Sequence, residues 1–463
     1  MIDILILVLF IAYSLSMGIR QRKSASRSLE HYFLANKSVA GWRAGFSMAA
    51  TQYAADTPLL VTGLVATGGL FILWRFWIYG FGYLLIAFIF AECWRRANVL
   101  TDAELTEVRY SGRATPWLRA FKAIYYGTVV NCFFLAMVLV ATVRIAEVFL
   151  PWHEWLPAVV YQTLSSALAP LADLMPVAVT ELEPQVAATN GLISVIVVTL
   201  FVFSYSTLGG LQAVIATDVL QFCLMMLGTA CYAWVLVAEA GGIEQLSARV
   251  GELYGDVMSR QLLGKLPIGQ QLAAPFVLIV ALQGLFWISS DGTGYLAQRC
   301  MACQTHHESR IAGVVFTWAQ ILGRSLLWSI IAVALLVVYP FDQADRAADF
   351  AVAREMTFVH GIQDLMPLGL RGVMLTALLA ALASTIDTHL NWGASYWSKD
   401  LYEDFICKLW LKRVPRPSEL TFVARLSNLI ILSIALTVML NLGSIQATWM
   451  VSLVFGAGIG GVL

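Results

Sequence analysis

"AALASTIDTHLNWG", residues 380–393, carries a Ser-Thr pair, an Asp, a second Thr, a His and an Asn within a long apolar stretch. Polar groups buried in lipid are costly unless they pair or face water, so each is a candidate for function. At about 100° per residue, Ser384, Thr385 and Thr388 share one helix face, with Asp387 at its side. Adjacent hydroxyl groups suit a dehydrated alkali cation, which prefers hard oxygen ligands. Alternatively, the hydroxyls bond to their own helix carbonyls or join neighbouring helices.

The composition of the whole chain indicates a membrane protein. It has 463 residues, of which 59% are hydrophobic and 13% are charged. Soluble proteins are usually about one quarter charged. The formal net charge is zero, and no basic face of the kind that nucleic acid requires is present. The seven cysteines are scattered, mostly inside apolar segments, so they do not form a disulfide framework.

Eleven apolar segments are long enough to cross a lipid bilayer, which takes about 20 residues each. They are 2–19, 44–66, 71–93, 119–150, 190–208, 211–239, 272–297, 311–340, 371–398, 420–441 and 444–463. An open strand would leave backbone groups unpaired in hydrocarbon, so these segments are expected to be helices. The predicted fold class is an all-α integral membrane protein. Because the last segment ends without polar residues, we expect the natural chain to continue beyond Leu463.

The charges of the loops predict the orientation. Lys and Arg residues number six, six and five in loops 20–43, 95–122 and 399–417. They number none, three and two in the alternating loops 151–190, 241–270 and 341–370. The positive-inside rule then places the first set in the cytoplasm and the N-terminus outside, in the plasma (inner) membrane. The long loop 151–190 is expected to be an external amphipathic segment, with a hairpin dipping into the membrane as the alternative.

The polar cluster at 380–393 is accompanied by two further unusual stretches. They read "SMAATQYAADTP" at 47–58 and "SYSTLGGLQAVIATDVLQF" at 204–222. Together with "AALASTIDTHLNWGASYWSKDLY" at 380–402, they closely resemble the sodium/solute symporter family. This family includes sodium-coupled sugar, proline, iodide and sialic acid carriers. The resemblance runs from about residue 30 to the end of the chain.

The resemblance implies one N-terminal helix followed by two inverted five-helix repeats, as in the bacterial leucine transporter. The implied parts are an N-terminal helix and cytoplasmic loop, a first repeat, an external loop and a second repeat, at 1–43, 44–240, 241–271 and 272–463. The first helix of each repeat would be broken near the membrane centre, where free backbone groups bind ions and substrate. Two stretches support these breaks from the residues alone. "QYAADTPLL" places Asp56 and Pro58 mid-segment, and "FWISSDGTGYLAQR" places Gly292 and Gly294 at the matching position.

Carried over residue by residue, the family's sodium site falls on three carbonyl groups and two hydroxyl groups. The carbonyls belong to Ala49, Gln52 and Ala381, and the hydroxyls belong to Ser384 and Thr385. Gln52 departs from the family, where an apolar residue is frequent at this position. A carbonyl ligand does not depend on its side chain, so the resemblance still implies Na⁺ as the bound ion.

A second ion site found in some family members would fall on Asp218, Asp387 and Thr388. The last two positions hold serines elsewhere in the family, so this chain departs from the pattern. Two carboxylates close together either bind a cation or share a proton. A second sodium, a coupled proton and a structural contact therefore all remain open. For Asp218, capping or pairing near the cytoplasmic helix end is an equally good interpretation.

The solute would lie between the two broken helices. The residues expected there are Asp56, Thr57, Trp287, Ser289, Ser290 and Asp291. Asp56 stands where sugar carriers of the family have a glutamine. Because a carboxylate accepts hydrogen bonds from hydroxyl or ammonium groups and repels anions, we expect a sugar, a polyol, or an amine or amino acid. Trp287 is equally well explained as an interface residue of the membrane.

The function that follows is sodium-coupled symport of a small organic solute into the cell by alternating access. Two alternatives are a proton-coupled carrier and a membrane solute sensor with a further domain beyond Leu463. His389 is a candidate proton relay, although a lone buried His is more often structural. In "CMACQTHH", residues 300–307, four potential zinc ligands lie too close together for a tetrahedron. Because no catalytic motif was found either, we do not expect an enzyme.

Overall fold

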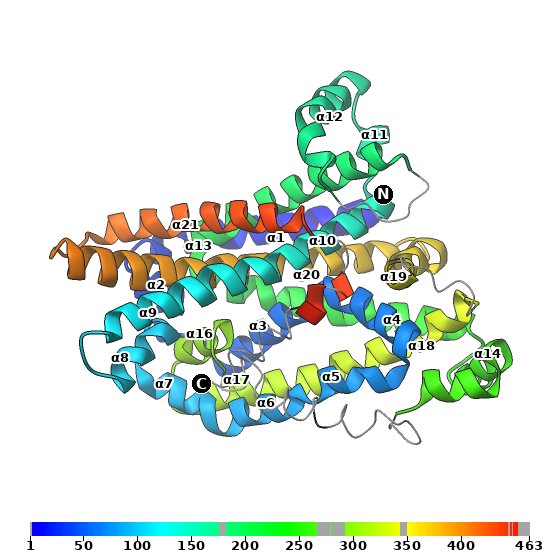
Figure 1. The fold of residues 1–463 in the computed structure, drawn as a ribbon, viewed down its shortest axis with the longest axis horizontal. Helices are drawn as coiled ribbons and strands as arrows, with labels where there is room; N and C mark the ends of the chain where they lie inside the picture. Colours follow the sequence, from blue (N-terminus) through cyan, green and yellow to red (C-terminus); the bar gives the residue numbers. More distant parts are fainter. Residues whose placement is uncertain are drawn as a thin grey trace.

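The fold is described here from a computed structural model. It describes residues 2–175, 182–265, 278, 292–342, 350–442, 445–446 and 448–451. Within these residues the regular structure is helical, and the β-type pairing is a single isolated bridge between Val39 and Cys303. Most of the long helices run side by side along the long axis of the molecule (Figure 1). The predicted all-helical fold class is confirmed for this part of the chain.

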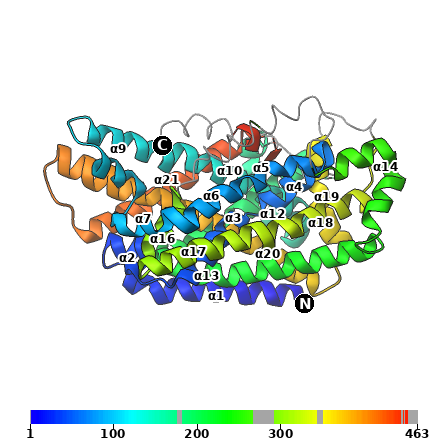
Figure 2. The ribbon, with the colours of Figure 1, turned by 90° about the horizontal axis from the view of Figure 1, so that it is seen from below.

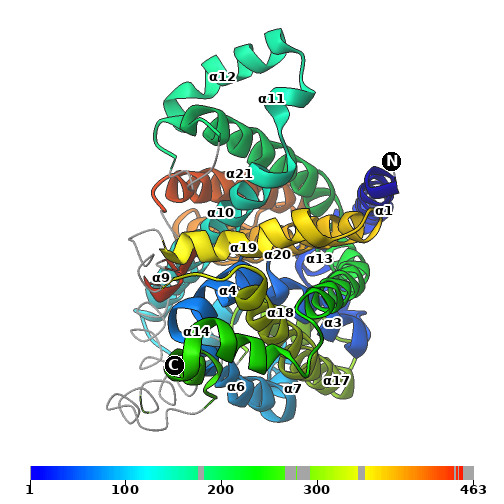
Figure 3. The same cartoon turned by 90° about the vertical axis from the view of Figure 1, so that its right-hand side faces the viewer.

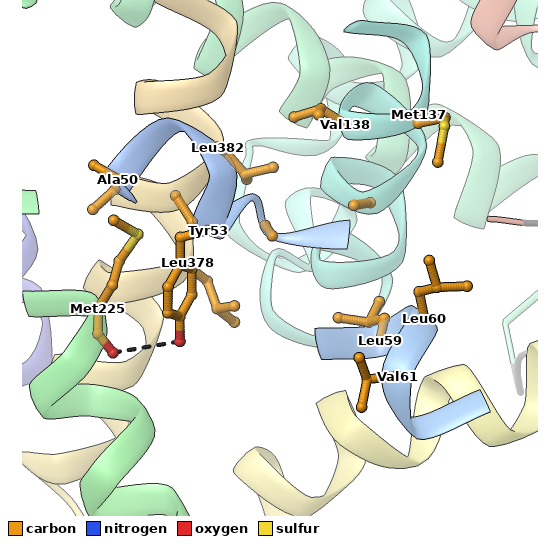
Figure 4. Packing of buried hydrophobic residues seen from close by; sticks show 14 of the residues in the cluster. Ala50, Tyr53, Leu59, Leu60, Val61, Met137, Val138, Met225, Leu378 and Leu382 are labelled. Carbon is orange, nitrogen blue, oxygen red and sulfur yellow. Dashed lines mark hydrogen bonds between the residues drawn. The ribbon is translucent and has the colours of Figure 1, made fainter. Parts of the chain in front are cut away.

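The first predicted repeat opens with a broken helix, as expected. α3 (Gly41–Tyr53) and α4 (Asp56–Gly68) are separated at Ala54, whose backbone is non-helical (φ 37°, ψ 137°). Pro58 is tolerated because it lies in the first turn of α4, where backbone N–H groups have no helical partner. Figure 4 shows the ends of these two half-helices, with Tyr53 beside Met225 and Leu378.

A second break lies inside α13 (Pro184–Glu239), which contains the two predicted spans 190–208 and 211–239. The helix is interrupted at Gly210, whose φ is 58° and ψ is −164°. A non-glycine residue rarely adopts this conformation. A Cβ at Gly210 would also lie 2.7 Å from the carbonyl oxygen of Tyr32. Both constraints explain why glycine stands at this position.

The other long segments are rods interrupted by π-helical turns. The first two comprise η2 (Leu70–Leu73), α5 (Trp74–Trp77), α6 (Tyr79–Leu85), η3 (Ile86–Phe90) and α7 (Ala91–Ala97), then α9 (Thr115–Ile124), η5 (Tyr125–Val130) and α10 (Asn131–Phe149). The later ones are α17 (His306–Trp318), η6 (Ala319–Arg324) and α18 (Ser325–Val338), then α20 (Leu370–Ser395) and η8 (Tyr396–Trp410), then α21 (Pro417–Met439). π-Helical turns are frequent at functional sites, and η6 is one of those that the candidate site uses.

Short helices cover the two ends of this bundle. At the left of Figure 1 are α2 (Leu29–Leu34), η1 (Ala35–Lys37), η4 (Asp102–Glu104), α8 (Leu105–Arg109) and α16 (Tyr295–Ala302). Toward the other end are α11 (Trp152–Trp155), α12 (Ala158–Ala172), α14 (Leu246–Leu263) and α19 (Phe350–Leu365). The three basic loops thus share one end, as predicted. That this end is cytoplasmic stays a prediction. α11 and α12, from the predicted external segment, project away from the bundle (Figure 3).

Seven helical segments of the described residues are long and apolar enough to span a membrane. α1 (Ile2–Ala25) is one of them and packs along α13 and α20 at the edge of the bundle (Figure 2). α13 alone covers two predicted spans, and α3 and α4 are each too short to count. Most of the predicted spans 272–297 and 444–463 lies outside the described residues. The number eleven and the repeat boundaries therefore remain predictions.

α20 occupies the centre of the molecule. Every residue from Ala380 to Tyr396 is buried, whereas a helix at the surface of a bundle buries one stripe. α20 packs against α13, α1, α10, α21 and α3. The polar residues quoted at the start therefore all point into protein, and the neighbours of each decide its role.

Replacing Gly210 with Ala should destabilise the protein, because the new Cβ meets the Tyr32 backbone and forces a Gly-only conformation. We expect a loss of about 1–3 kcal/mol, measured as a lower melting temperature in detergent. Gly251→Ala in α14 is the matched control, because no atom lies within 4 Å of a Cβ there. Equal melting temperatures for the two variants would contradict the prediction.

Candidate ion and solute site

The Ser-Thr pair of α20 connects three helices. The hydroxyl of Ser384 donates to Oδ1 of Asp218 on α13 at 2.6 Å. The hydroxyl of Thr385 lies 3.2 Å from the carbonyl oxygen of Thr51 on α3 and 3.0 Å from that of Ala381 on its own helix. The contact with Ala381 is the local bond weighed as the alternative, but the other two contacts are tertiary. The pair therefore lies where α3, α13 and α20 meet.

Side chains from η6 bond the predicted carbonyl ligands on α3. Nε2 of Gln320 lies 3.5 Å from the carbonyl oxygen of Ala49. A guanidinium N–H of Arg324 donates to the carbonyl oxygen of Gln52. Helix C-terminal carbonyls lack helical partners and attract positive charge. The end of α3 is thus built to receive a cation, and a guanidinium group contacts it in this structure.

Asp218 is fully buried and surrounded by donors. Besides Ser384, the hydroxyl of Ser47 donates to its carboxylate, and Nη2 of Arg299 lies 3.8 Å from Oδ2. Arg299 comes from α16, is itself fully buried, and also donates to Ser47 at 3.2 Å and to Thr388 at 2.5 Å. A buried charge is tolerated when it is paired and hydrogen-bonded. The structural contact left open for Asp218 is therefore present.

Asp387 and Thr388 lie on the other side of Arg299. The hydroxyl of Tyr205 donates to Oδ2 of Asp387 at 2.6 Å, and the hydroxyls of Thr388 and Thr51 are 2.9 Å apart. The charge of Arg299 acts on Asp387 as well as on Asp218. The predicted second-site residues are thus brought together, around a positive charge that the protein itself supplies.

His389 is held by Asn131 of α10. Its Nδ1 lies 2.6 Å from the side-chain oxygen of Asn131, whose Nδ2 donates to the His389 carbonyl oxygen at 2.9 Å. The imidazole packs edge-on against Trp392 and tilted against Tyr295. This environment fits the structural interpretation of His389 better than a proton relay.

Asp56 and Thr57 form the first turn of α4, directly after the break. They are 7% and 9% exposed. Oδ1 of Asp56 is buried and has no hydrogen-bond partner within the described part of the chain. The remaining predicted solute residues lie outside the described residues; they are Trp287, Ser289, Ser290 and Asp291. The chain is described again from Gly292, which has a positive φ, like Gly294 (86° and 89°), as suits a helix break.

The sequence analysis missed the two buried arginines, Arg299 and Arg324. Arg324 lies inside the predicted span 311–340, so the rule that charges at bilayer depth are functional candidates applies to it directly. Arg299 falls two residues beyond the span 272–297, where Lys and Arg are common. Tyr205, Ser47 and Thr51 carry no such signal, because their roles depend on which helices become neighbours.

The cysteines and histidines of 300–307 do not converge. Cys300 and Cys303 are buried, whereas His306 and His307 at the start of α17 are exposed. No group of three or more His, Cys, Asp or Glu side chains that could hold a metal ion occurs within the described residues.

The Sodium:solute symporter family matches this chain over residues 32–153 and 172–461. The "Sodium/glucose cotransporter" of Vibrio parahaemolyticus is 23% identical over 88% of this chain and 69% of its own length. The "Sodium/myo-inositol cotransporter 2" of Bos taurus is 23% identical over 94% of this chain and 60% of its own length. The chain thus spans about two thirds of the length of these relatives.

A solved structure has the same fold. It is described as the substrate-bound outward-open state of a Na⁺-coupled sialic acid symporter. The two chains superpose with a TM-score of 0.72 and 18% identity, over 100% of this chain and 84% of the other. At this identity the likeness concerns the architecture of the helices.

Removing one member of the buried Arg299–Asp218 pair should be strongly destabilising, because it leaves an uncompensated charge. We expect Arg299→Met and Asp218→Asn each to cost about 3–5 kcal/mol, and the double variant to cost less than the sum. Melting temperatures of the four proteins in detergent give the coupling.

Arg310→Met is the control for the loss of an arginine, because Arg310 is half exposed and lies 3.7 Å from Glu92. We expect it to change stability by less than about 0.5 kcal/mol. Additive costs of Arg299→Met and Asp218→Asn would mean that the two side chains do not stabilise each other.

Proposed function

The chain belongs to the sodium:solute symporter family, whose members are transporters rather than enzymes, and on this premise we propose how it couples an ion to a solute. Its activity is sodium-coupled solute symport, and Na⁺ is its coupling ion. It is a multi-pass membrane protein. In our proposal it carries a small organic solute into the cell by alternating access between the two sides of the membrane.

The observation that carries the proposal is the meeting of α3, α13 and α20 at the Ser-Thr pair. We propose that Na⁺ binds there, between the carbonyls and hydroxyls of the two helices. Its ligands would be Ala49, Gln52, Ala381, Ser384 and Thr385. A carbonyl oxygen has two lone pairs, so Gln52 can accept from Arg324 and still face an ion.

In this mechanism sodium works by joining two helices. With Na⁺ bound, the end of α3 is held against α20 by shared oxygen ligands in addition to the bond from Thr385 to Thr51. When Na⁺ leaves to the cytoplasm, where its concentration is low, α3 is freed from α20. The solute site at the start of α4 follows directly in the chain, so ion release and solute release are coupled.

Asp218, Asp387 and Thr388 remain our candidates for a second cation or proton site. Arg299 already brings a positive charge to these residues. A second cation would therefore bind only if Arg299 moves away, and a proton would compete with its charge. A single sodium per solute is the simplest stoichiometry that this arrangement supports.

We place the solute at the break between α3 and α4, against Asp56 and Thr57. The residues Trp287, Ser289, Ser290 and Asp291 would face it from the other broken helix. The cotransporters of glucose and myo-inositol named above act on solutes rich in hydroxyl groups. Hydroxyl and ammonium groups both suit the buried carboxylate of Asp56. The proposed classes are thus sugars, polyols, and amines or amino acids.

Sodium should stabilise the purified protein more than potassium at equal ionic strength. A ligand that binds only the folded state adds on the order of 1–3 kcal/mol at about ten to a hundred times its Kd. We expect a sodium-specific rise in melting temperature for the wild type that disappears in Ser384→Ala/Thr385→Ala.

Ser433→Ala/Thr437→Ala on α21 is the matched control. These two exposed hydroxyls bond only to carbonyls of their own helix, so this variant should keep the full sodium response. A sodium response that survives the loss of Ser384 and Thr385 hydroxyls would place the ion elsewhere. A shift with pH and none with sodium would favour proton coupling at Asp218 and Asp387.

The proposed orientation, with the N-terminus outside the plasma membrane, can be tested by labelling. In a variant without the seven native cysteines, Ser166→Cys on α12 and Ser26→Cys after α1 place exposed thiols at opposite ends of the bundle. A membrane-impermeant maleimide should label position 166 on intact cells and position 26 only after permeabilisation. The reverse pattern would invert the topology.

A further inference from the structure

We propose that the solute is a small zwitterion, an amino acid in its simplest form, whose carboxylate binds Arg324 and whose ammonium group binds Asp56. This inference rests on the proposed function and narrows its solute class. It is carried by two buried groups of opposite charge at the break between α3 and α4.

Arg324 lies in the middle of an apolar segment, at the end of the π-helical turn η6, and is 7% exposed. Its guanidinium group bonds the Gln52 carbonyl and stacks over the ring of Trp328, with 4.6 Å from Cζ to the ring centroid. Its Nε is buried without a hydrogen-bond partner among the described residues. Its remaining donors are thus available to an anionic group.

Asp56 lies four residues beyond Gln52, on the other side of the break. Its position in the first turn of α4 favours the charged carboxylate, because a helix N-terminus is positive. The charges of Asp56 and Arg324 attract each other, yet no ion pair joins these two side chains. The two groups therefore face one region without neutralising each other through direct contact.

Gln320 adds a neutral group to the same region. It lies one turn before Arg324 on η6 and bonds the Ala49 carbonyl through Nε2. Its Oε1 is buried and has no hydrogen-bond partner in the part of the chain that the structure describes. This oxygen can accept only from a donor such as an ammonium or hydroxyl group.

The combination of charges selects the solute. A neutral polyol would satisfy Asp56 and Gln320 but leave a buried guanidinium group without a counter-charge. A simple anion would pair with Arg324 but face the carboxylate of Asp56. A zwitterion offers each group its complement, so its binding removes two buried unpaired charges at once.

A competing interpretation is that Arg324 only caps the C-terminal end of α3 through the Gln52 carbonyl. In that case its substitution would lower stability without changing which solutes bind. The two interpretations differ in how affinity depends on the solute's carboxylate, and the experiment compares a solute with its uncharged analogue for that reason.

The experiment is a thermal-shift titration of the full chain in sodium. The probes are the twenty amino acids, glucose, myo-inositol and gluconate, followed by the tightest-binding amino acid and its carboxamide. We expect an amino acid to bind best, and the wild type to prefer it over its carboxamide by about tenfold or more. Arg324→Gln should abolish this preference, whereas Arg324→Lys should retain part of it. Arg310→Gln, on α17, is the control and should keep it in full.

Three outcomes would overturn the inference. One is stabilisation by glucose, myo-inositol or gluconate and by none of the amino acids. Another is an unchanged preference for the carboxylate in Arg324→Gln. If Arg324→Gln does not fold, equal affinity of the wild type for the amino acid and its carboxamide also decides against it. In each case a normal sodium response of the wild type shows that the proposed sodium coupling stands, whereas its loss would remove both proposals together.

Discussion

A helix that stops in the middle of a membrane leaves carbonyl groups that lipid cannot hydrate. α3 stops at Tyr53, and the structure satisfies its last turn with side chains from other helices. Arg324 bonds the carbonyl of Gln52, Gln320 approaches that of Ala49, and Thr385 approaches that of Thr51. The same scarcity of water makes these carbonyls good ligands for a bare cation. Structural stability and ion binding thus depend on one set of backbone oxygens.

The buried charges follow from the same constraint. Each arginine enters the core beside a carboxylate on another helix: Arg299 beside Asp218, and Arg324 near Asp56. The first pair is close and shares hydroxyl partners, so it holds α13 and α16 together. The second pair is not in direct contact, which leaves its members able to act on a bound molecule. The difference in pairing separates a structural charge network from a binding one.

The sequence predicted those features that depend on local chemistry. The break before Pro58 and the apolar spans followed from residue types and periodicity, and the Ser-Thr face of α20 followed from helix geometry. Gly210 separates two predicted spans that the structure joins into one interrupted helix. The roles of Arg299 and Arg324 could not be derived in this way, because each acts on a helix distant in sequence. The ion ligands came from the family resemblance, since a backbone carbonyl leaves no mark in a sequence.

The complete burial of α20 has a consequence for how the protein is made. Of the seven candidate spans, the segment that begins with α20 has the lowest mean hydropathy. A helix with Ser, Thr, Asp, His and Asn around its circumference partitions poorly into lipid on its own. α1, α3 and α13, which surround it, are all synthesised earlier. Insertion of α20 would then use a protein surface already waiting in the membrane, so that the order of synthesis is also the order of assembly.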